Sequence, residues 1–139
     1  MKNLLLLTLF ITFILQSCGG ELVYNKESPN IKVSEGKLIY KGEFYTGKYI
    51  RYWDDGTLTK IKERCSYKNG VPHGECEFYH ENGQLERKGS YKNGLKDGVW
   101  EEYHENGKLK RKGSYINGMM DGVWKFFNED GSLERTETY

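Results

Sequence analysis

The sequence contains little that points to a membrane-spanning helix, a helical bundle or a nucleic-acid partner. Its 21 basic and 20 acidic side chains leave a formal charge of +1 over 139 residues, which is too small to hold nucleic acid by displacing counterions. The apolar run at residues 4–15 is shorter than the roughly 20 residues of a membrane-spanning helix. Only two prolines stand beside 17 glycines, a balance that favours many short strands joined by turns.

Aromatic side chains are the main apolar resource of the chain. They make up 14% of the residues, with 11 Tyr, six Phe and three Trp, while all hydrophobic residues together reach 37%. Burial must therefore rely on rings, which favour β-sheet over helix. The length allows one small domain and a targeting segment, because domains cluster near roughly 100–150 residues.

The N-terminus has the features of an export signal that ends at a cysteine. Lys2 gives a basic start, residues 4–15 are apolar, and a Leu-Gln-Ser-Cys run then ends at Cys18. This ending resembles the lipobox of bacterial lipoproteins, although Gln16 stands where a small residue is commoner. The resemblance implies that residues 1–17 are a lipoprotein signal peptide and that Cys18 becomes acylated. The alternative is an ordinary secretory signal with an incidental cysteine.

The segment that begins at Cys18 is expected to attach the protein to a membrane. Acyl chains on this cysteine would anchor the N-terminus, because each buried methylene contributes roughly 0.8 kcal/mol. The resemblance implies a lipid-anchored protein of the cell envelope, and Gly19 favours the outer membrane or cell surface over the inner membrane. Residues 18–34 are polar and show no sustained periodicity, so we interpret them as the lipidated cysteine and a tether.

Most of the remaining chain is one unit repeated. Units begin at about residues 47, 74, 98 and 122, and the last three recur every 24 residues. A half-unit at residues 36–46 precedes them, and we assign residues 35–139 to the repeat region. Each full unit carries a leading glycine, two aromatic positions, a tight turn, a leucine and a closing tyrosine. The turn glycines are Gly56, Gly83, Gly107 and Gly131.

The repeat is predicted to be a β-hairpin. A unit of 24 residues accommodates two short strands and two turns but not two packed helices. The turn glycines follow Asp or Asn, and these dipeptides tolerate positive φ at both central positions of a tight hairpin turn. The sequence therefore predicts an all-β fold, an elongated antiparallel sheet of stacked hairpins in which neighbouring units stabilise each other.

Stacking places equivalent residues of successive units in line. Positions 49, 76, 100 and 124 are expected to form one core row, and positions 52, 79, 103 and 127 a second one. Trp100 and Tyr103 are three residues apart, so either one of them lies on the opposite face or the strand carries a bulge. The predicted core consists of Tyr49, Tyr52, Leu58, Tyr67, Phe78, Tyr79, Leu85, Tyr91, Trp100, Tyr103, Leu109, Tyr115, Trp124, Phe127 and Leu133.

Two cysteines replace a glycine and a tryptophan at one junction between units. Cys65 stands where later units have Gly89 and Gly113, and Cys76 stands where a later unit has Trp100. An exported chain meets an oxidising compartment, and thiols on adjacent strands satisfy the Cα separation that a disulfide requires. We predict a Cys65–Cys76 disulfide that joins the first and second units. Two buried free thiols are the alternative.

The cadence NGxxDGxWxxYxENGxL resembles the bacterial variant of the MORN repeat (membrane occupation and recognition nexus). The family includes proteins labelled YwqK-type antitoxins. The resemblance covers residues 36–139 and implies a β-hairpin repeat fold. It also implies a role as a scaffold or attachment surface, because members of the family serve in that way.

No set of residues predicts catalysis, a cofactor or a metal site. His80 and His104 occupy one slot of the repeat, so two strand spacings put them about 10 Å apart. That separation is too large for one metal ion. The carboxylates are abundant, but a stacked sheet offers no evident cleft in which they could converge.

We therefore predict a non-catalytic, membrane-anchored interaction or scaffold protein that binds a protein or glycan on the bacterial envelope. The alternative is an antitoxin-like factor that neutralises a co-encoded toxin. Basic residues at 87–88 and 110–112 form either a stripe for anionic lipid or glycan, or a solvated face balanced by glutamates. Residues 132–139 are expected to form a sheet edge that either invites strand addition or is protected by its charges.

Overall fold

The computed structural model describes residues 21–24, 30–54 and 59–139. The predicted signal peptide, Cys18, Gly56 and Leu58 lie outside these residues. The regular secondary structure of the described residues consists of strands alone, which confirms the predicted all-β class. The strands are β1 (Glu21–Tyr24), β2 (Ile31–Ser34), β3 (Lys37–Tyr40), β4 (Glu43–Phe44), β5 (Gly47–Tyr52), β6 (Ile61–Lys68), β7 (Val71–Tyr79), β8 (Leu85–Lys92), β9 (Leu95–Tyr103), β10 (Leu109–Ile116), β11 (Met119–Phe127) and β12 (Leu133–Thr138).

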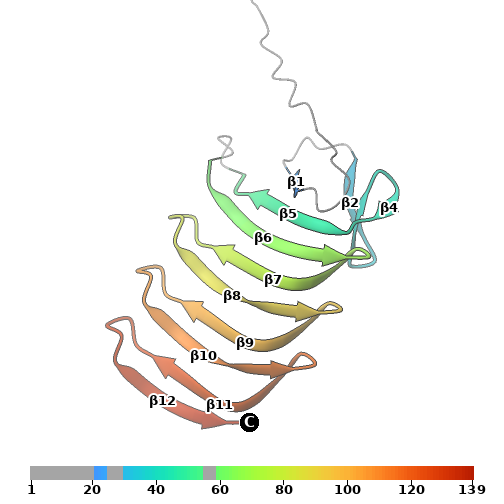
Figure 1. The fold of residues 1–139 in the computed structure, drawn as a ribbon. Helices are drawn as coiled ribbons and strands as arrows, with labels where there is room; N and C mark the ends of the chain where they lie inside the picture. The colour runs from blue at the N-terminus through green and yellow to red at the C-terminus, as the bar shows by residue number, and fades with distance from the viewer. Residues whose placement is uncertain (1–20, 25–29, 55–58) are drawn as a thin grey trace, which may run out of the picture.

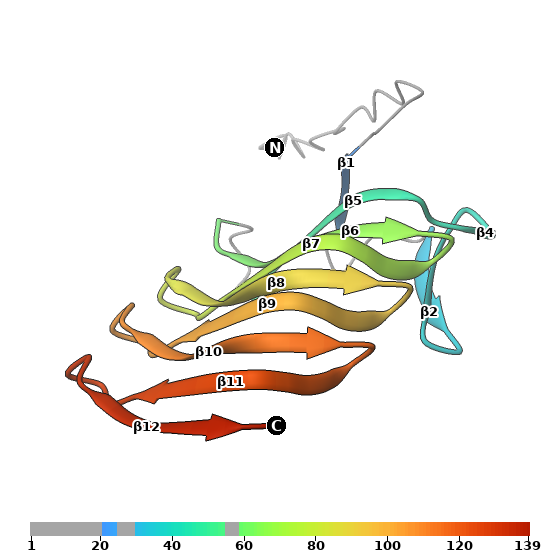
Figure 2. The ribbon, with the colours of Figure 1, turned by 60° about the horizontal axis from the view of Figure 1, so that its bottom comes forward.

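One long sheet contains nine of these strands (Figures 1 and 2). Strands β5 to β12 follow one another in chain order and pair antiparallel, so that each hairpin stacks beside the next. Strand β1 joins the outer edge of β5 in parallel. This arrangement confirms the predicted sheet of stacked β-hairpins. The strands are bowed, and β12 forms the end of the sheet farthest from β1.

Two kinds of turn alternate along the sheet. The two-residue turns have positive φ at both centres, as at Asn93 (52°) and Gly94 (84°). In the longer turns of the last three hairpins only the glycine is left-handed, as at Gly83 (85°), and the Asn82 side chain accepts a hydrogen bond from the Gln84 amide (2.9 Å). The expected positive φ at both centres of the Asn82-Gly83 turn is therefore wrong. The Asn82 side chain closes the wider loop by imitating a backbone carbonyl.

The N-terminal part departs from the predicted tether and half-unit. Strands β1 and β2 lie within residues 18–34, and each is paired in a sheet. Strands β2, β3 and β4 form a separate three-stranded sheet, so residues 36–46 do not extend the repeat array. The physical reason is a hydrophobic cluster built from Leu22, Leu38 and Tyr49, whose side chains are almost completely buried. Burial of these side chains offsets the entropy lost in ordering the segment.

A bulge in the second strand of each hairpin separates the residues of the repeat onto two faces. Leu109 pairs with Tyr103, whereas Arg111 pairs with Glu102, which leaves Lys110 as an extra residue on β10. The same shift recurs in the other three hairpins. The corresponding extra residues are Lys62, Glu86 and Glu134.

Tyr103 lies on the face opposite to Trp100. Its hydroxyl donates a hydrogen bond to Glu101 (2.8 Å), two residues earlier on the same strand and therefore on the same face. Both alternatives for this pair hold in part, because Tyr103 faces the other way and the bulge lies on the neighbouring strand. We name the side of Trp100 and Trp124 the ring face, and the side of Glu101 and Tyr103 the charged face.

The first predicted core row lies on the ring face and is buried. Tyr49, Cys76, Trp100 and Trp124 are at most 5% exposed. The second row lies on the charged face and is only half-buried, so its assignment to the core is wrong. The bulge places it beside the leucines of the second strands, of which Leu133 is 56% exposed. That row comprises Tyr52, Ile61, Tyr79, Leu85, Tyr103, Leu109, Phe127 and Leu133.

The closing tyrosines pack edge-on against the tryptophans of the ring face. The ring of Trp100 lies 5.0 Å from that of Tyr91 and 6.2 Å from that of Tyr115, both close to perpendicular. Tyr115 contacts Trp124 in the same way, at 5.0 Å between ring centres. These T-shaped contacts join one unit to the next, as the stacked-hairpin prediction requires. Tyr67 repeats the contact at the first unit, with its ring 5.6 Å from that of Tyr49.

Candidate functional site

A continuous row of large side chains crosses the ring face beside the tryptophans. Successive members pair in register from β5 to β12, and each hairpin contributes two of them. No core prediction includes its arginines, its glutamates or Phe126, which is 9% exposed. We name this row the arginine row, and its members are Arg51, Glu63, Phe78, Arg87, Glu102, Arg111, Phe126 and Arg135.

The arginines of successive hairpins alternate between two kinds of partner, a carboxylate and an aromatic ring. In the third repeat unit, Arg111 forms two hydrogen bonds with Glu102, at 2.7 and 2.6 Å. This bidentate contact raises the pKa of Arg111 above its ordinary value. In the second and fourth units a phenylalanine replaces the carboxylate. The guanidinium of Arg87 then lies 4.2 Å from the ring centre of Phe78, in a cation–π contact.

Arg87 keeps unused hydrogen-bond donors. Its cross-strand neighbour Glu102 already binds Arg111 on the other side. The ion pair between Arg87 and Glu86 is long, with 3.8 Å between a guanidinium nitrogen and a carboxylate oxygen. Among the described residues, the buried Nε of Arg87 has no hydrogen-bond partner. A guanidinium with spare donors on a partly exposed face is well suited to a carboxylate or hydroxyl group of a partner.

Lys96 adds a second cation beside Arg87. Its ammonium lies 4.3 Å from the ring centre of Trp100 and 4.7 Å from that of Tyr115. Burial of this group lowers the pKa of Lys96, because a charged amine loses hydration there. The centre of the ring face therefore gathers Arg87, Lys96 and Arg111 around the single carboxylate of Glu102, which leaves an excess of positive charge.

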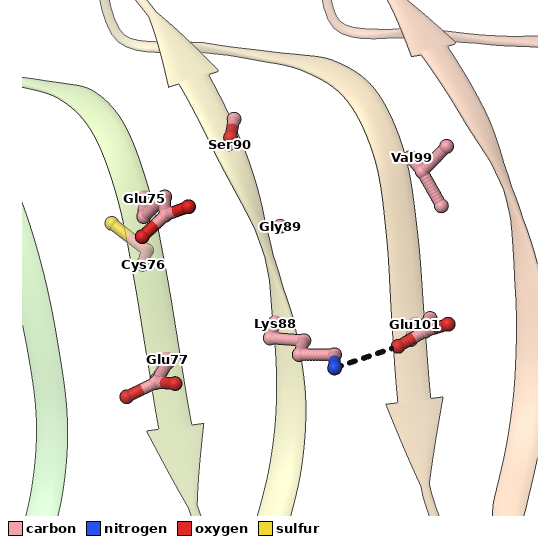
Figure 3. Close-up of a pocket in the computed structure, with 8 residues that line it drawn as sticks. All are labelled: Glu75, Cys76, Glu77, Lys88, Gly89, Ser90, Val99 and Glu101. Atoms are coloured by element: carbon pink, nitrogen blue, oxygen red, sulfur yellow. Dashed lines mark ion pairs between the residues drawn. The ribbon is translucent and has the colours of Figure 1, made fainter.

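The charged face has a shallow depression between β7, β8 and β9 (Figure 3). The depression has a volume of about 410 Å³, and its floor includes Gly89 and Ser90. Lys88 crosses its lower rim to Glu101, with 3.0 Å between the ammonium and a carboxylate oxygen. Because Arg87 and Lys88 point to opposite faces, the basic residues do not form one stripe. The lysines are balanced by glutamates on their own face.

Glu101 is the electrostatic centre of the charged face. Its carboxylate accepts hydrogen bonds from Lys112 (2.7 Å) and from the Tyr103 hydroxyl (2.8 Å), and Lys88 contacts it from the other side. These groups, Lys112 foremost, lower the pKa of Glu101 from 4.5 to about 2. The ionised carboxylate therefore links β8, β9 and β10.

Glu101 is expected to make the stability of the protein depend on pH in acid. Its pKa is lower in the folded state, so its contribution is complete above about pH 4.5 and is lost as the pH falls toward 2. Glu101→Gln should lower the melting temperature near neutral pH and reduce its slope between pH 4.5 and 2. Thermal unfolding at stepped pH measures this, with Glu75→Gln on the same face as the matched control. Equal slopes in the wild type and Glu101→Gln would refute the assignment.

The histidines of the long turns connect neighbouring hairpins. The Nε2 atom of His80 lies 3.1 Å from the carbonyl oxygen of Tyr103, and that of His104 lies 3.0 Å from the carbonyl oxygen of Phe127. Asn106 adds a bond from its side-chain amide to the next turn, 2.8 Å to the carbonyl of Glu129. Among the described residues, no cluster of three or more His, Cys, Asp or Glu side chains could hold a metal ion.

Cys65 and Cys76 face each other across β6 and β7 and form a disulfide. Both side chains are buried, at 3% and 1% exposure. The corresponding positions of the next unit explain the exchange. A Cβ built on Gly89 would overlap the indole of Trp100, so the glycine is needed beneath the ring. Where the tryptophan is replaced by Cys76, the opposite position can carry a side chain.

Comparison with known proteins identifies the repeated unit. The family model described as MORN repeat variant matches three consecutive segments, residues 72–93, 96–117 and 120–139. These segments are MORN repeats of the variant type. Each matched segment covers most of the tryptophan or cysteine strand, the longer turn and the bulged strand that follows. The hairpin that begins at residue 47 precedes the matched segments, and its second strand pairs with the first of them.

The repeats are the basis for any statement on function. MORN repeats suggest a binding or scaffold role that rests on the repeated surface. A comparison with curated proteins finds no match to the chain. In the part of the chain that the structure describes, no helix is long and apolar enough to cross a membrane.

Proposed function

We propose that this protein is a non-catalytic, membrane-anchored scaffold that binds a protein or glycan on the bacterial envelope through its ring face. The arginine row is the observation that carries the proposal. It runs across eight successive strands, its arginines lie alternately beside a glutamate and over a phenylalanine ring, and the guanidinium groups remain partly exposed. Arginine and aromatic residues are the side chains that contribute most to binding at protein interfaces.

The ring face suits a partner whose polar groups can hydrogen-bond to planar guanidinium groups. Trp100 and Trp124 are fully buried, so they support the surface and do not form it. The contact surface consists of the guanidinium groups, the ammonium of Lys96 and the edges of half-buried tyrosines such as Tyr91. The Arg87 side chain is 37% exposed, and its ion pair with Glu86 is long, at 3.8 Å. Carboxylates of a protein or hydroxyls of a glycan would give this guanidinium closer contacts.

Neighbouring residues on opposite faces provide a matched test of the binding surface. Arg87→Ala with Arg111→Ala removes two cations from the ring face, whereas Lys88→Ala with Lys112→Ala removes two from the charged face. We expect the arginine pair to abolish capture of partners from solubilised envelopes, and the lysine pair to preserve it. Circular dichroism establishes that each variant remains folded. Equal capture by both folded variants would contradict binding through the ring face.

The proposed anchor is tested on the full chain. With Cys18 acylated, the protein should enter the detergent phase of extracted membranes, and Cys18→Ser should move it to the aqueous phase. Metabolic labelling with a fatty acid gives an independent measurement. An unlabelled wild-type chain that behaves like Cys18→Ser would contradict lipid anchoring and leave the binding surface as a separate question.

A further inference from the structure

The two outer edges of the β5 to β12 part of the long sheet differ, because one is paired with another described strand and the other is not. Strand β1 covers the outer edge of β5 (Figure 1). At the other end, no described strand pairs with the outer edge of β12. An unpaired strand presents a row of backbone donors and acceptors to any strand of suitable sequence.

The free backbone groups of β12 can be assigned from its pairing with β11. Gly122 and Tyr139 exchange two backbone hydrogen bonds, of 3.2 and 3.0 Å. Antiparallel strands alternate between bonded and non-bonded pairs. Arg135 and Glu137 therefore bond inward to β11, whereas the N–H and C=O groups of Thr136 point outward.

We propose that β12 pairs antiparallel with β12 of a second copy of this chain, about a two-fold axis at Thr136. The two Thr136 residues then exchange backbone hydrogen bonds, and their side chains form a cross-strand threonine pair. Arg135 stands opposite the partner's Glu137 on the ring face, and the symmetry repeats this contact. Because the axis is perpendicular to the sheet, the two ring faces join on one side of a continuous sheet.

The charges of β12 favour this register over its neighbours. Shifting the axis to Arg135 would place two arginines opposite each other, and shifting it to Glu137 would do the same for two glutamates. Like charges directly opposite each other are destabilising. In the single chain, Arg135 bonds to Glu137 (2.6 Å) and Glu134 (2.8 Å) on its own strand. Pairing exchanges these exposed contacts for equivalent ones across the new interface.

Cysteine cross-linking tests the register. In the full chain with Cys18→Ser, Thr136→Cys puts two thiols on residues whose Cα atoms are about 5.5 Å apart in a bonded pair, within the range of a disulfide. In the matched variant Thr138→Cys, the two thiols lie four residues apart along the strands, roughly 13 Å. We expect efficient cross-linking for Thr136→Cys and none for Thr138→Cys. Equal cross-linking, or none in either variant, would overturn the proposal.

Sedimentation equilibrium tests the pairing without a cross-link. Thr136→Pro removes an N–H that the single chain does not use, so it should leave thermal unfolding of the monomer intact and abolish the dimer. Arg135→Glu should raise the dissociation constant by about tenfold or more, because it faces the partner's Glu137. Adding Glu137→Arg should restore dimerisation. A wild-type chain that stays monomeric at high concentration, or a Thr136→Pro variant that still dimerises, would refute the inference.

Discussion

Replacing Trp100 with alanine is expected to lower the free energy of unfolding by about 3–5 kcal/mol, the range for a large buried aromatic side chain. The indole is completely buried, its Nε1 donates to the carbonyl of Ser90 (3.0 Å), and its edges contact Tyr91 and Tyr115. Its removal leaves a cavity above Gly89 and breaks contacts that join successive units. Chemical denaturation followed by tryptophan fluorescence and circular dichroism measures the loss.

Tyr103→Ala is the matched control for this substitution. Tyr103 belongs to the same strand but to the charged face, where it is half-buried and bonds to Glu101. We expect it to cost about 1–2 kcal/mol, since less apolar surface and one hydrogen bond are lost. If both variants lost the same stability, the two rows would be equivalent, and the ring face could not be the core.

Much of the fold could be predicted from the spacing of a few residues. A leading glycine every 24 residues, with an aromatic residue two positions later, predicted stacked hairpins and located Trp100 and Trp124 in one row. The information is local, because each hairpin repeats the same short contacts with its neighbour. The burial of Phe126 could have been predicted in the same way. Alignment of the units places it in register with Phe78, which was predicted to be core.

The two faces could not be separated from the sequence, because an extra residue in a strand leaves no compositional signal. Lys110 has the appearance of an ordinary exposed strand residue. Its presence moves Leu109 to the side of Tyr103, so that counting by twos from Tyr115 assigns the leucine to the wrong face. The second predicted row is real, but it lies on the charged face for this reason.

The N-terminal segment was misjudged because its contacts are distant in sequence. Leu22 packs with Tyr49, its partner on β5, which is 27 residues later in the chain, and with Leu38 of the separate three-stranded sheet. Residues 18–34 carry few apolar side chains, and periodicity within the segment cannot indicate a partner strand elsewhere. The arginine row was missed for a related reason. Arg111 and Glu102 have the composition of a solvated surface, and only the strand register brings them together.

Breaking the disulfide by Cys65→Ser with Cys76→Ser is expected to lower the free energy of unfolding by about 3 kcal/mol, the chain-entropy value for a short loop. The two cysteines are 11 residues apart and join the first hairpin to the MORN repeats. Denaturation in the presence and absence of a reductant measures the effect. The wild type should lose a similar amount when reduced, and the serine variant should not respond to the reductant.

A second double variant distinguishes the covalent bond from the contact that it replaces. Cys65→Gly with Cys76→Trp introduces the pair that the later units use, an indole lying over a glycine as Trp100 lies over Gly89. Position 76 already faces Gly89, just as Trp100 faces Gly113, so the ring has a glycine on both neighbouring strands. We expect stability within about 1 kcal/mol of the oxidised wild type, with no response to reductant. A variant as unstable as the serine pair would show that the first junction has lost the geometry of the later ones, and that the disulfide there is not a substitute for a ring.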